Sequence, residues 1–181
     1  MGDRPGGNHT RAIGITDLVG IAAIFKLPES DPPTWAEIGS TGIWGWQFEK
    51  GDRIHVYYEM DHAWQVGSEF QFHVHWRPED TNTGTVAWQL QDYQVSSIGD
   101  ALAGAGSDSG IDCYDPGSGV QFEHQMTAMH DISGVGHTVS FFLEGTLHRF
   151  DDAADTYTGD PYLMAADVHY RRARRGSDVR D

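Results

Sequence analysis

The chain has 181 residues, which is enough for one domain with short extensions at its ends. Acidic residues number 27 and basic residues 12, and the net charge of -15 opposes binding to nucleic acids or anionic lipids, which need a basic surface. The single cysteine, Cys113, excludes both an internal disulfide framework and a zinc site built from several thiolates. The most apolar stretch, 18–25, is too short to span a membrane, so no membrane partner is expected.

Residues 1–34 have the composition of an extended N-terminal arm. They begin with a turn-prone, glycine-rich segment and end in a stiff segment with prolines at 28, 32 and 33. The arm has apolar side chains with no evident cover inside one chain, and we expect a neighbouring subunit or capsid protein to cover them: Ile21, Ile24, Phe25 and Leu27. The arm is therefore predicted to be an attachment element.

From residue 35 onward, apolar side chains alternate with polar ones in several segments, and this period of two is typical of strands with one buried face. The clearest alternation covers 53–60, 69–76, 85–95 and 137–148, and weaker strands fit 120–128 and 162–171. The segment 98–119 is rich in Gly, Asp and Ser and is expected to be a long loop.

These elements predict an all-β fold, a jelly-roll-like antiparallel β-sandwich with an extended N-terminal arm. The sandwich domain is expected over 35–171, after the arm at 1–34. A basic C-terminal tail follows at 172–181, and it is either solvated or lies as a strap on the acidic body of a neighbouring subunit.

A metal site is suggested by one strand, in which Gly67, His73, His75, Glu79 and Gly84 follow one another in a spacing close to the first motif of the cupins. Alternate residues of a strand face the same way, so the two imidazoles lie together with a carboxylate nearby. Cupins are jelly-roll proteins in which two histidines and a glutamate hold a metal. The chain would then be a metal-binding enzyme that uses His73, His75 and Glu79.

The rest of the cupin pattern is missing, because no second motif supplies a third histidine at the right spacing. His73 and His75 also occupy the polar face of an ordinary half-buried strand, where they can hydrogen-bond to neighbours such as His169. We therefore expect no catalytic residue, no cofactor and no bound metal.

An aromatic cluster at Trp44, Trp46 and Phe48 lies where the arm joins the sandwich. Such a cluster packs in a core or, in the functional alternative, forms a platform on which a carbohydrate stacks. We assign Trp44 and Trp46, with the apolar residues of the arm, to a capsid or subunit interface.

Several motifs follow one another along the chain in this order: Trp35 with Ile38–Trp44, Met60–Trp64, Gly67–Trp76, Gly84–Leu90, Asp155–Tyr157 and Ala166–Tyr170. This order resembles that of a group of tailed-bacteriophage virion structural proteins. The resemblance spans residues 35–171 and implies a non-enzymatic virion component built as a jelly roll.

Its implied role is a capsid decoration or cement protein, a homotrimer that stabilises the head by binding the major capsid protein on the capsid surface. A tail or head-fibre protein that recognises a host glycan is the alternative within the same group.

Overall fold

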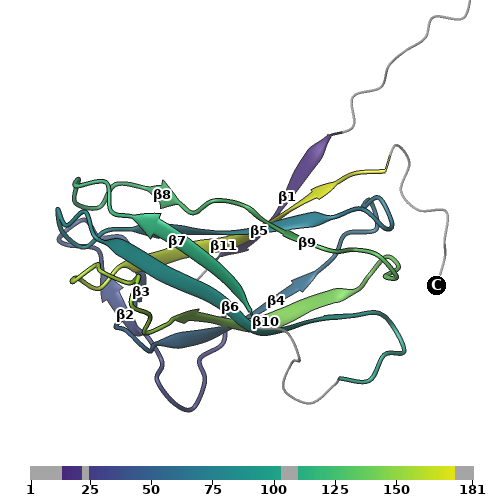
Figure 1. The fold of residues 1–181 in the computed structure, drawn as a ribbon, viewed down its shortest axis with the longest axis horizontal. Helices are drawn as coiled ribbons and strands as arrows, with labels where there is room; N and C mark the ends of the chain where they lie inside the picture. The colour runs from purple at the N-terminus through teal and green to yellow at the C-terminus, as the bar shows by residue number, and fades with distance from the viewer. Residues whose placement is uncertain (1–13, 22–24, 103–109, 174–181) are drawn as a thin grey trace, which may run out of the picture.

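The computed structural model describes residues 14–21, 25–102 and 110–173, and every helix or strand assigned within them is a β-strand. Two antiparallel sheets pack face to face, and Figure 1 shows them as two layers. The predicted all-β, jelly-roll-like sandwich is confirmed. In these described ranges there is no helix of the length and apolarity that a membrane span requires.

Within the described ranges, the larger sheet has seven strands: β1 (Ile15–Ile21), β2 (Thr34–Glu37), β3 (Trp44–Gln47), β5 (Phe70–Arg77), β8 (Gln125–Met126), β9 (His130–Ile132) and β11 (Tyr162–Arg171). Its central strand is β11, which pairs with β5 along one edge. The other edge of β11 is shared, because β3 pairs with its first two residues and β1 with residues 165–171. In the same way β8 and β9 divide the far edge of β5.

The smaller sheet, as far as the structure describes the chain, has four strands in the order β4 (Arg53–Glu59), β10 (Phe142–Arg149), β6 (Thr85–Ser96) and β7 (Ile111–Pro116). A register shift between Glu144 and Thr146 marks an irregularity in the pairing of β10 with β6. Both sheets turn one face toward the other, so each strand needs apolar residues on alternate positions only.

The core consists of the side chains that the period-two pattern placed inward. In β5 these are Phe70, Phe72, Val74 and Trp76, and all four are fully buried. The inward residues of the other predicted strands are buried as well: Ile54, Val56, Tyr58, Met60, Val86, Trp88, Leu90, Val139, Phe141, Leu143 and Leu147.

A buried ion pair joins the end of β10 to the loop before β11. The guanidinium of Arg149, 1% exposed, donates to both carboxylate oxygens of Asp155 at 3.0 and 3.2 Å. Its remaining donors reach the backbone carbonyls of Phe48, Gly159 and Tyr157 at 2.8–2.9 Å. Because all of these polar groups are paired, the loop is fixed at one position against both sheets.

The arm differs from the prediction, because its residues 15–21 form β1 and pair in register with β11. Phe25, expected at an interface, belongs to the core with 8% of its surface exposed, and Lys26 forms a backbone bridge to His55 in β4. The chain itself thus covers Phe25, whose ring packs against Tyr58 of β4. Leu27 is 46% exposed, whereas Ile24 lies outside the described residues.

The predicted loop at 98–119 is also wrong in part, since it contains β7. Cys113 in this strand is fully buried opposite Trp88, and burial raises the pKa of its thiol to about 12. Further along, Asp115 accepts a hydrogen bond from the Trp76 indole at 2.7 Å. The predicted strand at 120–128 reduces to the two residues of β8, and most of the basic tail, 174–181, falls outside the described residues.

Candidate functional site

A group of tryptophans lies on one face of the hairpin formed by β2 and β3. The register places Trp35 opposite Trp46 and Glu37 opposite Trp44. Directly opposed residues of an antiparallel pair project to the same side of the sheet. Three indoles and one carboxylate therefore share this face, which we call the tryptophan face (Trp35, Glu37, Trp44 and Trp46).

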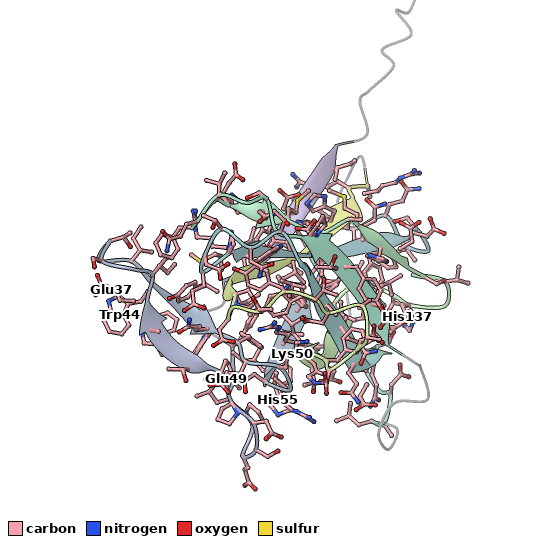
Figure 2. The ribbon with its side chains drawn as sticks, turned by 60° about the vertical axis from the view of Figure 1, so that its left-hand side comes forward. Glu37, Trp44, Glu49, Lys50, His55 and His137 are labelled. Atoms are coloured by element: carbon pink, nitrogen blue, oxygen red, sulfur yellow. The ribbon has the colours of Figure 1, made fainter. Side chains whose placement is uncertain are left out.

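The tryptophan face is open to solvent although its base is packed. Trp46 contacts the core and makes an edge contact with Trp35, their ring centroids 4.8 Å apart at an interplanar angle of 62°. Trp35 and Trp44 are 40% and 49% exposed. Figure 2 shows Trp44 and Glu37 at the outer end of the hairpin, away from the centre of the sandwich.

The turn of the hairpin is held by specific contacts. The Ile38 amide donates to the Ile43 carbonyl at 2.8 Å, and the Gly42 amide donates to the Glu37 carboxylate at 2.6 Å. Gly39 and Gly42 both have positive φ angles, 58° and 75°, which other residues adopt only with strain. These bonds order the hairpin before any ligand binds, which lowers the entropy cost of binding.

The exposed indoles offer flat apolar surfaces next to a carboxylate and backbone groups. Large exposed apolar side chains are costly to leave in water and often mark interaction sites. Aromatic rings beside a few polar groups are also the usual lining of small-ligand sites. The tryptophan face therefore has the chemistry to bind a ligand with both apolar faces and hydroxyl groups.

The structure divides the predicted aromatic cluster. Phe48 is fully buried and packs against Trp88, Trp46 is half-buried, and Trp44 is exposed. The prediction did not include Trp35, because its neighbour is set by strand register rather than by proximity in sequence. The spacing of Trp35 and Glu37 was the available signal, because residues two apart in a strand lie on the same face.

The cupin-type trio does not assemble. His73 and His75 do lie side by side on the outer face of β5, with Nε2 atoms 2.9 Å apart. Glu79 lies beyond the end of that strand, where its carboxylate accepts hydrogen bonds from the Gln47 amide at 3.0 Å and the Asp160 backbone at 2.8 Å. A cupin-like site with Glu79 as the third ligand is therefore wrong for this fold.

No protein-family model matches the sequence, and no curated protein matches it either. Among solved structures, the fold is similar to CBM35 from Cellvibrio japonicus Abf62, with a TM-score of 0.50 at 13% identity, over 87% of this chain and 99% of that one. A second structure, Xyl-CBM35 in complex with a glucuronic acid containing disaccharide, gives a TM-score of 0.48 at 13% identity, over the same shares of the two chains.

Proposed function

We propose that this chain is a non-catalytic binding module that recognises a carbohydrate through the tryptophan face. The observation that carries the proposal is the pair of half-exposed indoles, Trp35 and Trp44, held on one side of an ordered hairpin. The C–H faces of a sugar ring stack on such indoles, while its hydroxyl groups hydrogen-bond to a carboxylate such as Glu37.

The size of the exposed surface favours a sugar over a protein partner. A stable protein interface uses about 20–30 residues on each side. The hairpin exposes three large apolar side chains, Trp35, Ile43 and Trp44, which matches one or two sugar rings. The fold supports the same proposal, since a carbohydrate-binding module of the CBM35 type is built on a similar sandwich.

The proposed setting is a virion. It depends on the ordered motifs between residues 35 and 171, which resemble those of tailed-bacteriophage structural proteins. In that setting the module would sit on the particle surface and bind a glycan of the host. No catalytic residue is part of the proposal.

A second candidate is the decoration or cement role, in which Trp44 and Trp46 contact the major capsid protein or another copy of a homotrimer. The exposure of further apolar side chains favours it, because Leu27 and Ile43 are exposed as well as Trp44. The two candidates use the same face but different partners, so binding assays separate them.

The test is a screen of purified full-length protein against a panel of oligosaccharides and bacterial surface polysaccharides, followed by calorimetry on any glycan that binds. Trp44→Ala should weaken binding at least about tenfold, which is a loss of about 1.4 kcal/mol. The matched control is Tyr57→Ala, since Tyr57 is an equally exposed aromatic residue, 54%, on the other sheet. This variant should bind as the wild type does.

The proposal is wrong if the wild type binds no glycan, or if Trp44→Ala binds as tightly as the wild type. Cosedimentation with phage capsids then distinguishes the second candidate. Capsid binding that depends on Trp44, without glycan binding, would assign the tryptophan face to the shell.

A further inference from the structure

A second cluster of polar side chains lies on the outer face of the larger sheet, far in sequence from the tryptophan face. His73 and His75 project from β5, and Asp167 projects from β11 directly opposite His73. Both strands send their apolar residues into the core, so their polar residues gather on the opposite side. We call these three residues the His–Asp cluster.

The separations within the His–Asp cluster match those of ligands around one tetrahedral ion. The Nε2 atoms of His73 and His75 are 2.9 Å apart, and the Asp167 Oδ2 atom lies 3.2 Å from Nε2 of His75 and 3.9 Å from Nε2 of His73. With metal–ligand bonds of about 2.0–2.1 Å, the edge of a tetrahedron is about 3.3 Å. The three observed separations lie around this value without any movement of the backbone.

Burying the polar groups of the His–Asp cluster costs free energy unless a cation compensates the carboxylate. His73 is fully buried, Asp167 is 6% exposed, and neither Asp167 Oδ1 nor His73 Nδ1 has a hydrogen-bond partner among the residues that the structure describes. A metal ion would use the lone pair of a neutral His73 imidazole and would supply the positive charge that the buried Asp167 carboxylate needs.

A neighbouring residue orients His75, one of the three ligands, as outer partners do around known metal sites. The Nδ1 atom of His75 lies 2.8 Å from Nε2 of His124, so an N–H at Nδ1 can donate to His124 and leave Nε2 of His75 free. A hollow lined by His75, His124, Met164 and Asp167 opens on one side of the cluster. A water molecule has room there to complete the coordination.

We propose that Nε2 of His73, Nε2 of His75 and Oδ2 of Asp167 bind one divalent transition-metal ion of the zinc class. Two imidazoles with one carboxylate suit Zn²⁺, Co²⁺ or Ni²⁺, whereas Ca²⁺ and Mg²⁺ prefer a shell made of oxygen ligands. The proposal revises the expectation of no metal, which was based on the missing cupin motif. It is independent of carbohydrate binding, because the cluster and the hairpin share no residue.

The competing explanation is a metal-free network, in which a protonated His75 forms an ion pair with Asp167 at 3.2 Å. In that case the orphaned oxygen of Asp167 stays unpaired and the protein has no preference for a transition metal. Metal titration distinguishes the two explanations.

The experiment uses the full chain without a histidine tag, stripped with a chelator and titrated with Zn²⁺ by calorimetry and with Co²⁺ by visible absorption. We expect one equivalent of each metal and the intense absorption bands of four-coordinate Co²⁺. His75→Ala and Asp167→Asn should each weaken Zn²⁺ binding at least about 100-fold, and His124→Ala about 10–100-fold, as expected for an outer partner. The control His55→Ala, on the other sheet, should bind as the wild type does.

Circular dichroism of the metal-free variants shows whether each is folded, and His73, which is buried, is left unchanged for that reason. The Co²⁺ spectrum is measured on the wild type, so it tests the proposal even if a variant fails to fold. An absence of saturable binding in the wild type overturns the proposal, and so does equal affinity in His75→Ala and wild type. Loss of metal with Trp44→Ala is not expected, and glycan binding should survive the chelator.

Discussion

Arg149 and Asp155 form a bidentate ion pair with almost no access to solvent, although they lie only six residues apart across a turn of the chain. The carboxylate of Asp155 also accepts from the Ala87 amide at 3.1 Å and lies 3.4 Å from Lys50 Nζ. The pair thus connects β10, β6 and the loop before β11 through one set of polar contacts. Removal of this ion pair should lower the stability of the whole sandwich.

Arg149→Met is expected to lower the free energy of unfolding by about 3–5 kcal/mol, because it leaves the buried carboxylate of Asp155 uncompensated. Asp155→Asn should lower the free energy of unfolding by a similar amount, because it leaves the buried guanidinium of Arg149 uncompensated. Urea denaturation followed by tryptophan fluorescence measures both. The double variant should be less destabilised than the sum of the two, and strict additivity would show that the pair is not coupled.

Gly84→Ala should lower the free energy of unfolding by more than about 2 kcal/mol, since an added Cβ at this position would overlap the backbone of Thr156. The matched control is Gly14→Ala, because no atom of the described part of the chain lies within 4 Å of the added atom there. This control should change stability by no more than about 0.5 kcal/mol. Thermal and urea denaturation of the two variants, compared side by side, decide the prediction.

Phe25→Ala is expected to lower the free energy of unfolding by about 3 kcal/mol, because the ring is 8% exposed and contacts Tyr58. Leu27→Ala, two residues further on and 46% exposed, should change it by less than about 0.5 kcal/mol. If both variants were as stable as the wild type, Phe25 would not belong to the core, and the interface role expected from the sequence would be favoured again. The measurement is again denaturation of the isolated protein.

His148 is expected to make the fold less stable in mild acid. Burial lowers its pKa from 6.5, Arg53 lowers it further, and Asp31 opposes the change. Below about pH 6.5 the unfolded chain therefore binds a proton that the folded chain does not, so the free energy of unfolding falls as the pH decreases. His148→Gln should flatten this dependence between about pH 7 and about pH 5. An unchanged slope in urea denaturation at several pH values would contradict the assignment.

The strands that the sequence predicted well are those with one face in the core. In β5, for instance, four large apolar residues alternate with polar ones, and the alternation leaves no other secondary structure compatible with burial. β7 was missed because its inward apolar side chains are only Ile111 and Cys113, in a segment otherwise rich in Gly and Asp. β1 was taken for part of an arm, because apolar residues occupy several faces of that segment and its partner is β11, at the other end of the sequence.

The candidate sites were predictable only within single strands. The spacing of His73 and His75 placed both imidazoles on one side, and their contact is observed. The third member of the cluster, Asp167, depends on the register between β5 and β11, which no spacing in the sequence reveals. Trp35 was absent from the predicted cluster for the same reason, since its contact with Trp46 crosses from β2 to β3.

The central position of β11 also determines when the sandwich can be completed during folding. This strand pairs with β1 and β3 near the start of the chain and with β5 in its middle, so its contacts close very long loops. Such closures cost chain entropy before any contact compensates them, and they make folding slow. Until β11 docks, β1 and β5 each present an unpaired backbone edge, which is a template for aggregation. Production of this protein is therefore expected to benefit from slow synthesis at low temperature or from chaperones that shield open strands.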